Sequence, residues 1–324
     1  MKEKNIIELF KIITKDLTVP SFVKKGIGED AAVLEIGGSY YLITTDLLIE
    51  DTHFKQKWIS PFALGYKALA VNLSDIAAMG GKPEYFLISI GIPKDFSSKD
   101  IDELIKGLKK IAQKYQVFLI GGDTVRAEKI VINITVLGKT EKKPFFRSGA
   151  KVGDIILVSR FLGDAAAGLA ILENNLNQKD FLSLINAHLF PEPEVDLGLY
   201  LAETQLVHAA IDISDGIASD LMWICEESNV GAKIYKTKIP ISSICKKAAH
   251  KLNKNPLEWA LSGGEDYALL FTIPPNALKQ IKEGIWKKFK REVFVIGEIT
   301  EGNKVLLVSE KKIIDISGKG FSHF

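Results

Sequence analysis

The residues that decide the fold of the first half of the chain are Tyr40-Tyr41-Leu42-Ile43-Thr44-Thr45-Asp46. Aromatic, apolar and β-branched residues follow one another here without polar alternation, a pattern typical of a buried strand. The run then ends in two hydroxyl groups and a carboxylate. It therefore predicts a strand that carries polar oxygen atoms to one edge of a sheet.

A second short run, Ala31 to Ile36, lies just upstream, and Gly37-Gly38-Ser39 joins it to this strand. Two β runs separated by a three-residue connection that contains glycine predict a hairpin. If the turn is centred on Gly38, Asp30 lies directly opposite Asp46. Like charges across a ladder destabilise a sheet, so we expect a cation between these two carboxylates.

The composition predicts a soluble globular protein. The chain has 324 residues, enough for two domains of ordinary size, with 47 % hydrophobic and 25 % charged residues. Its formal net charge of +2 gives no electrostatic reason to expect nucleic acid or an anionic membrane as a partner. No apolar run approaches the roughly 20 residues that span a bilayer.

Neither a signal peptide nor a cysteine framework is predicted. Residues 1–17 place apolar side chains at helical spacing between charged ones, which indicates an amphipathic helix. Cys225 and Cys245 lack Cys-x-x-Cys spacing, so a thiolate zinc site or a disulfide framework is not expected. We therefore expect a cytoplasmic protein.

Strands and helices are mixed along the chain without tandem repeats, which predicts an α/β (α+β) fold in two domains. A short, charged segment at 139–148 marks the boundary, so we expect domains at 1–140 and 150–324 with a linker at 141–149. The expected helices are 61–79, 100–115, 164–172 and 217–227, and the expected later strands are 85–90, 116–120, 130–137, 154–159, 207–211 and 267–273.

Acidic residues recur at the ends of buried strands or beside glycine pairs: Asp30, Asp46, Asp75, Asp123, Asp212 and Asp215. Each has a structural alternative. Asp215 could cap the helix that follows it, Asp123 could be a turn residue, and Asp75 could face solvent from its helix. Taken together, and without a matching His and Cys cluster, they indicate the hard oxygen ligands that suit Mg²⁺.

The familiar nucleotide-binding motifs are missing from the sequence. Gly80-Gly81-Lys82 runs into Pro83 and lacks the earlier glycine of a phosphate-binding P-loop. The protein-kinase motifs and Gly-x-Ser-x-Gly are also absent. If the chain handles ATP, magnesium and the backbone amides of Gly121 and Gly122 must do what a P-loop lysine does elsewhere.

Six blocks of sequence resemble the thiamine-monophosphate kinase family and occur in its order over nearly the whole chain, up to the closing Gly-Phe-x-His-Phe. They are Gly26-Ile27-Gly28-Glu29-Asp30-Ala31-Ala32, Thr44-Thr45-Asp46 with His53-Phe54, Asn72-Leu73-Ser74-Asp75-Ile76-Ala77-Ala78-Met79-Gly80, Ile120-Gly121-Gly122-Asp123-Thr124, Ile213-Ser214-Asp215-Gly216 and Gly263-Gly264-Glu265-Asp266-Tyr267. The resemblance implies the two-domain fold shared with aminoimidazole ribonucleotide synthetase and a homodimer paired through its N-terminal sheets. It also implies the reaction of ATP with thiamine monophosphate to give ADP and thiamine diphosphate.

The resemblance also implies roles for individual residues, with several Mg²⁺ ions as cofactors and ATP as co-substrate. The implied magnesium set is Asp30, Thr44, Thr45, Asp46, Asp75, Asp123, Asp212 and Asp215. The implied ATP contacts are Gly121, Gly122, Arg147 and Ser214, and the implied thiamine phosphate contacts are His53, Glu265 and Phe321.

Four positions depart from the family pattern. Glu29 stands where the family usually has Asp, and Ile105 where a nucleotide-stacking Tyr is common. Arg160 replaces an expected Gly, and Glu194 stands where Arg is usual. These departures put individual contacts in question, adenine stacking at Ile105 above all.

The implied reaction needs no general base, because a phosphate monoester has a second pKa of about 6 and is largely dianionic at neutral pH. The obstacle is repulsion, since two unit charges about 4 Å apart cost roughly 4 kcal/mol at an effective dielectric of 20. We therefore expect direct in-line transfer assisted by several Mg²⁺ ions, without a phosphoenzyme.

Two alternatives stay open. One is another ATP-dependent synthetase of the same superfamily; selenophosphate- and hydrogenase-maturation-type members rely on a reactive Cys near a chain end, where Cys225 and Cys245 do not lie. The other is a non-catalytic module that binds a structural divalent ion or a nucleotide.

Overall fold

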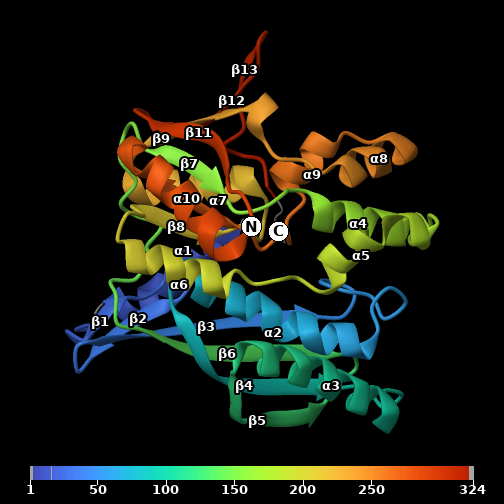
Figure 1. Ribbon diagram of the computed structural model, residues 1–324. Coiled ribbons are helices and arrows are strands. Elements are labelled where there is room, and N and C mark those ends of the chain that lie inside the picture. Colours follow the sequence, from blue (N-terminus) through green and yellow to red (C-terminus); the bar gives the residue numbers. More distant parts are fainter. Residues whose placement is uncertain (1–2, 16, 321–324) are drawn as a thin grey trace.

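The first half of the chain forms a six-stranded sheet at the bottom of Figure 1. A computed structural model describes residues 3–15 and 17–320. The strands follow the order β1-β2-β3-β6-β4-β5 and pair antiparallel, except for the parallel pair β4 and β5. Their bounds are β1 Val23–Lys25, β2 Ala32–Ile36, β3 Ser39–Ile49, β4 Lys82–Ile92, β5 Phe118–Arg126 and β6 Val131–Thr140.

Three helices belong to this half: α1 Glu3–Lys15, α2 Pro61–Ala78 and α3 Ser98–Tyr115. The Ser60 hydroxyl accepts a hydrogen bond from the Ala63 N–H at 3.2 Å, and Pro61 suits a first turn, so the sequence starts α2 at this point. The helix ends where Gly80 takes a φ of +69°. Nearly all of α2 is buried, because the sheet covers one side and the second half of the chain covers the other.

The second half forms a seven-stranded mixed sheet in the order β13-β12-β9-β11-β7-β10-β8. Its strands are β7 Ile155–Val158, β8 Ala209–Asp212, β9 Gly231–Tyr235, β10 Leu269–Ile273, β11 Phe294–Thr300, β12 Val305–Val308 and β13 Ile313–Asp315. Its α-helices are α4 Asp164–Glu173, α5 Leu182–Leu189, α6 Val195–Thr204, α7 Ile217–Ser228, α8 Ser243–Leu252, α9 Pro256–Ser262 and α10 Leu278–Phe289. Three 3₁₀ turns complete it: η1 Gln178–Phe181, η2 Lys236–Lys238 and η3 Pro275–Ala277.

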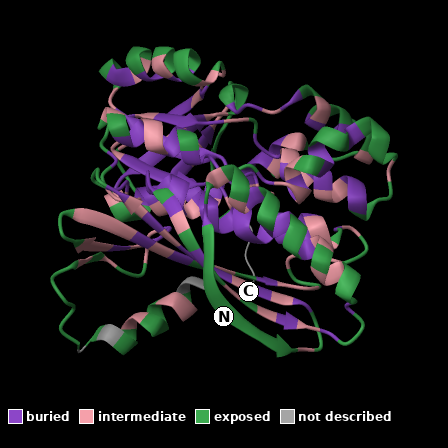
Figure 2. Ribbon diagram, turned by 60° about the horizontal axis from the view of Figure 1, so that its bottom comes forward, coloured by how far each residue is buried: buried purple, intermediate pink, exposed green. Residues whose placement is uncertain are grey.

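The two halves meet along α2 and α6, which lie between the two sheets in Figure 1. The approach is close, since a Cβ built on Gly198 of α6 would stand 2.2 Å from the Ala77 carbonyl oxygen of α2. Buried residues are concentrated on the strands and the inner faces of the helices (Figure 2). Polar groups of α2 can therefore reach the second half of the chain.

The hairpin prediction is confirmed, but its predicted register was wrong by one residue. Ala32 pairs with Ile43, so the ladder continued outward by two residues would set Asp30 beside Thr45 rather than Asp46. The reason is the turn: Gly37 and Gly38 both have positive φ, 61° and 82°, and form a two-residue turn instead of a three-residue connection.

The strand expected at 116–120 is longer and later than predicted. It runs to Arg126 as β5, because Gly121, Gly122 and Asp123 continue the parallel ladder with β4. The other expected elements occur with shifted ends; the strand expected at 207–211, for example, is β8 at Ala209–Asp212. Within the described residues, no helix is long and apolar enough to cross a membrane.

Candidate active site

Five aspartates from separate parts of the chain are among the described residues that line one cavity of about 480 Å³ between the two halves. They are Asp30 before β2, Asp46 on β3, Asp75 on α2, Asp212 at the end of β8 and Asp215 before α7. We call these five residues the acid cluster. Thr44, Thr45 and Ser214 line the same cavity, so the structure gathers most of the oxygen donors that the sequence singled out.

Helix α2 holds the acid cluster together from its last two turns. The Ser74 hydroxyl donates to Asp212 Oδ2 at 2.6 Å, which ties α2 to β8. Asp75 Oδ2 accepts a hydrogen bond from Thr44 Oγ1 at 2.5 Å, which ties the same helix to β3. The alternative that Asp75 faces solvent is therefore wrong, since its carboxylate points into the space between the sheets.

Burial and mutual repulsion raise the pKa values of the cluster. Burial, with the charges of Asp30 and Asp215, raises the pKa of Asp46 to about 6. Burial and the charge of Asp30 raise the pKa of Asp212 to about 8, although the Ser74 hydrogen bond acts against this. The pKa of Asp75 is raised for the same reasons. These carboxylates have too few cationic partners to offset the free-energy cost of ionisation in a buried site.

Among the described residues that line this cavity, Arg147 is the one lysine or arginine. Its Nε lies 3.1 Å from Asp30 Oδ1, and its guanidinium stands 5.6 Å from the Trp223 ring centroid. Glu29 Oε2 accepts a hydrogen bond from the Arg147 backbone N–H at 2.7 Å, and Oε1 lies 3.0 Å from Lys25 Nζ. Both carboxylate oxygens of Glu29 therefore have partners, and one of these is the backbone of Arg147 itself.

The donor chemistry of the acid cluster fits magnesium. Asp30 Oδ2 is buried without a hydrogen-bond partner, and the raised pKa values mark carboxylates short of positive charge. Within the described part of the chain, no three His, Cys, Asp or Glu side chains already form a metal-holding group.

Two predicted substrate contacts, His53 and Glu265, line the same cavity. His53 Nδ1 accepts a hydrogen bond from the Ile49 backbone N–H at 3.0 Å, so a neutral ring carries its proton on Nε2. Glu265 lies 2.7 Å from Lys67 Nζ and 2.8 Å from His188 Nδ1. Its backbone has a φ of +60°, a strained conformation for a residue with a side chain.

A second cavity, of about 920 Å³, adjoins the first. Residues that line both cavities are Glu29, Asp30, Thr44, Thr45 and Arg147. From this shared wall the second cavity extends past Trp223 toward α1. The acid cluster therefore stands beside a junction between two cavities, each with room for one ligand.

Three predicted site residues do not join the cluster within one chain. Gly121, Gly122 and Asp123 lie on β5, the edge strand of the first sheet. The pairings Asp46–Ile134, Ile134–Ile88 and Ile88–Gly122 put three strand spacings, about 14 Å, between Asp46 and Gly122. Ile105 is 52 % exposed on α3 and lines neither cavity. Phe321 lies outside the described residues.

The alternative that Asp215 caps α7 is wrong, since Gly216 occupies that position and no side chain caps the helix. Sequence reasoning also missed one nearby acid. Asp220, on α7, is buried and accepts a hydrogen bond from the Asp215 backbone N–H at 3.3 Å. Burial and the charges of Asp215 and Asp212 raise the pKa of Asp220. In the sequence, a single acid in the first turn of a helix does not indicate a buried residue of a site.

The departures at positions 160 and 194 are two halves of one contact. Arg160 Nη2 lies 2.6 Å from Glu194 Oε1, and Arg291 Nη1 donates to the same oxygen at 3.0 Å. The Ser159 hydroxyl donates to it as well, at 2.9 Å. Glu194 is thus paired with two arginines, and Arg160 is one of them.

Comparison with known proteins defines the class first. A family model for the N-terminal domain of AIR synthase related protein matches residues 28–140, and one for the C-terminal domain matches residues 151–309. The fold predicted from the sequence is confirmed: two such domains, each with a mixed sheet.

The close relatives then narrow the class. The thiamine-monophosphate kinase of Bacillus subtilis is 37 % identical over 328 residues and covers 98 % of each chain. That of Aquifex aeolicus is 36 % identical, over 95 % of this chain and 96 % of its own. A solved structure, AaThiL complexed with AMPPCP and TMP, matches with a TM-score of 0.87 at 34 % identity, over 100 % of this chain and 97 % of the other. The chain belongs to the thiamine-monophosphate kinase family of AIR synthase related proteins.

Proposed function

We propose that this protein transfers the γ-phosphoryl group of ATP to thiamine monophosphate and so releases ADP and thiamine diphosphate. The observation that supports this most is the junction of two cavities beside the acid cluster. A reaction between two phosphorylated ligands needs one space for each and a place where their phosphates meet. The nucleotide would occupy the larger cavity, next to Arg147, and thiamine monophosphate the smaller one, next to His53 and Glu265.

Magnesium ions would be held by the acid cluster together with Thr44 and Thr45, and by Asp123 as argued below. When bound, magnesium neutralises the facing phosphates and lines up their oxygens for in-line displacement. The acid cluster, with Arg147 beside it, suits several divalent ions and would repel a bare triphosphate.

The remaining roles follow from where the side chains stand. Arg147 and Ser214 would bind the phosphates of ATP. His53 would donate from Nε2 to the substrate, because its Nδ1 is already used by the Ile49 N–H. No side chain needs to act as a general base, since the acceptor phosphate is already ionised at neutral pH. Transfer would be direct, without a phosphorylated enzyme.

The decisive experiment is a coupled ADP-release assay with magnesium and ATP, in which thiamine, thiamine monophosphate and aminoimidazole precursors are compared as acceptors. We expect ADP only with thiamine monophosphate. Turnover with an aminoimidazole precursor would favour another synthetase of the superfamily, and no turnover with any acceptor would favour a non-catalytic binding module. A labelled phosphoaspartate after acid quench would contradict direct transfer.

A homodimer paired through the first sheet is the second part of the proposal. All nine residues of β5 are exposed, and Phe118, Leu119, Ile120 and Val125 are each more than half exposed. A long apolar edge strand of this kind is a liability that proteins cover. A second copy placed there would cover it and could bring Gly121, Gly122 and Asp123 to the acid cluster of its neighbour.

Mixing two inactive variants tests this arrangement. Asp123→Asn and Asp212→Asn are each expected to abolish activity. If each site takes Asp123 from one copy and Asp212 from the other, half of the sites in a mixed dimer are intact. Random mixing would then restore roughly a quarter of wild-type activity. No restoration, in a mixture shown by mass measurement to contain mixed dimers, would place both residues in the same chain.

A further inference from the structure

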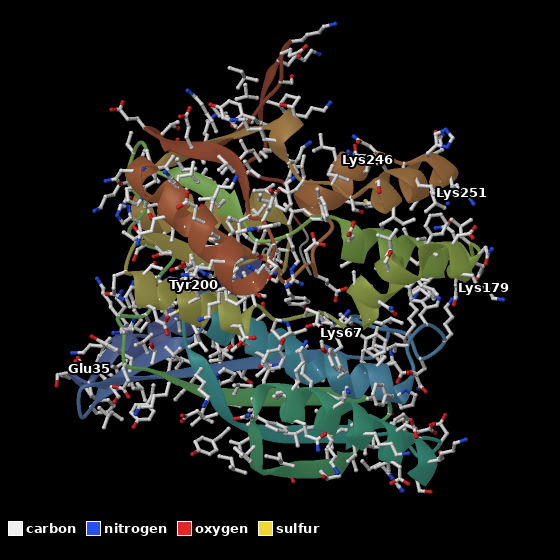
Figure 3. The ribbon with its side chains drawn as sticks, viewed as in Figure 1. Glu35, Lys67, Lys179, Tyr200, Lys246 and Lys251 are labelled. Atoms are coloured by element: carbon white, nitrogen blue, oxygen red, sulfur yellow. The ribbon has the colours of Figure 1, made fainter. Side chains whose placement is uncertain are left out.

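Lys67 is a cation in an unusual place. It lies in the middle of α2, on the apolar stripe that also carries Ala63, Ala70 and Ser74, and only 1 % of its surface is exposed. Lysine is almost never this buried unless it is paired. Figure 3 shows it on the side of α2 that faces the second half of the chain. Its partner there is Glu265, at 2.7 Å.

A third residue completes this group. His188, on α5, is buried, and its Nδ1 lies 2.8 Å from the other oxygen of Glu265. At 2.7 and 2.8 Å, the Lys67 and His188 nitrogens are both in direct contact with the Glu265 carboxylate. Burial and the nearby charge of Lys67 lower the pKa of His188, which is therefore neutral at pH 7. The group then holds one cation and one carboxylate.

The group fixes both the charge and the direction of Glu265. Burial would raise the pKa of this carboxyl, but Lys67 and then His188 hold it below its usual range. The backbone is fixed as well, since the Glu265 N–H donates to the Ser214 carbonyl at 2.7 Å. The Glu265 side chain nevertheless remains 27 % exposed and lines the smaller cavity. Lys67 and His188 thus keep the Glu265 carboxylate ionised, while its exposed part faces the smaller cavity.

We propose that Lys67 and His188 are positioning residues that hold Glu265 as a fixed, ionised acceptor for the nitrogen heterocycle of the acceptor substrate. This inference rests on the proposed function. A cationic ring or an amino group on a heterocycle is the chemistry that such a carboxylate recognises. Lys67 belongs to the first half of the chain, and His188 and Glu265 belong to the second. The orientation of Glu265 therefore also depends on how the two halves pack against each other.

The test compares Lys67→Met, Glu265→Gln and the double variant in the ADP-release assay. Lys67→Met is expected to raise KM for thiamine monophosphate about tenfold, because the buried Glu265 carboxyl takes up a proton once its cation is gone, and only about a tenth of it stays ionised when its pKa exceeds the pH by one unit. KM for ATP should stay within twofold of wild type. In the Glu265→Gln background, Lys67→Met should add no further rise, because it acts only through Glu265.

A pH profile separates positioning from mere stabilisation. The titratable and charged groups around Glu265 are Lys67 on α2, His188 on α5, Glu173 on α4 near His188, Tyr267, and the cavity acids Asp46, Asp75 and Asp212. The ratio of the Lys67→Met KM to the wild-type KM should grow as pH falls from 8 to 6, since Glu265 then takes up a proton. The ratio cancels the titration of the substrate phosphate and of the groups that both proteins share.

Arg291→Met is the matched control, since it removes one cation from buried Glu194 outside both cavities. It should lower thermal stability and leave both KM values unchanged. If Lys67→Met behaves in the same way, the positioning role is overturned.

Should Lys67→Met fail to fold, His188→Leu and His188→Asn replace it. Leu should raise KM for thiamine monophosphate, and Asn, which keeps an N–H near Glu265, should restore most of the loss. A wild-type enzyme without thiamine monophosphate-dependent ADP release would sink the proposed function and this inference together. If Glu265→Gln raises KM while the changes at Lys67 and His188 do not, this inference alone fails.

Discussion

Two buried carboxylates in this protein have opposite surroundings. Glu194 is 5 % exposed and Asp212 is 3 % exposed, so the two are equally deep. Glu194 has Arg160 and Arg291 beside it, and despite its burial these two cations lower its pKa. Asp212 faces other carboxylates, and burial together with Asp30 raises its pKa to about 8.

The difference shows how to tell a structural acid from a functional one. A carboxylate whose cations are built into the fold is already neutralised and has nothing left to bind. A carboxylate without them is destabilising in the free protein and is satisfied only when a cation arrives with a ligand. Glu265 belongs to neither kind, because Lys67 is its cation within the fold and its carboxylate still faces the cavity.

The largest effect is expected from Asp212→Asn, which removes a charge from the cluster and keeps its shape. We expect kcat for ADP release to fall at least about a thousandfold, which corresponds to roughly 4 kcal/mol of transition-state stabilisation. Glu194→Gln, assayed below its melting temperature, should retain most of its activity. Substantial activity in Asp212→Asn would remove this residue from the catalytic machinery.

Glu194→Leu should have the largest effect on stability. It leaves two arginines without their buried partner, and such changes typically cost 3–5 kcal/mol. Arg160 and Arg291 are 27 % and 34 % exposed, so water offsets part of this and we expect a loss of about 3 kcal/mol. Urea unfolding at pH 7 measures it. A loss below about 1 kcal/mol would show that the pair contributes little.

Ligand binding should stabilise one kind of carboxylate and not the other. Magnesium with a non-hydrolysable ATP analogue at about 100 times its dissociation constant should stabilise the wild type by about 2.7 kcal/mol. This gain should disappear in Asp212→Asn and persist in Glu194→Gln. Thermal melts with magnesium alone, analogue alone and both together measure it. Equal gains in the two variants would contradict the division drawn above.

The last prediction concerns the pH dependence of stability. Between the usual pKa of an aspartate, 3.8, and the raised values of about 6 for Asp46 and about 8 for Asp212, the native state binds more protons than the unfolded state. Their contribution to stability is thus present at low pH and is lost as pH rises through this window. Asp212→Asn should be more stable than the wild type at pH 8, and this difference should shrink as pH falls and vanish by pH 4. Urea unfolding of the metal-free proteins measures this difference, and a gain that does not change with pH would contradict it.

The sequence predicts much of the fold and of the acid cluster because short-range patterns carry both. The buried run at residues 40–46 and the Ala-rich helix after Pro61 are local signals, and each of their acids sits at a fixed place within its element. The hairpin register was missed by one residue because it depends on the φ angles of Gly37 and Gly38, which no hydrophobic pattern reports.

Other parts of the site depend on contacts that the sequence does not encode locally. Lys67 meets Glu265 across almost two hundred residues, and nothing in the sequence around either residue indicates the other as its partner. Asn72, on the same helix, accepts a hydrogen bond from the Asp46 backbone N–H at 2.9 Å, again a contact between distant segments. Asp123 was grouped with the cluster by motif, yet the sheet order carries it to the edge strand. The domain limits and the cytoplasmic location stay predictions.

Helix α2 carries Lys67 near its middle and Asp75 eight residues further along, a rise of about 12 Å. A single stiff element thus fixes the separation between the residue behind Glu265 and the residues that would gather the phosphates, and neither end can shift without the other. We expect this fixed distance to limit the length of the acceptor that can react. Thiamine diphosphate bound as a second acceptor would carry its terminal phosphate past the acid cluster, so we expect the reaction to end after one transfer.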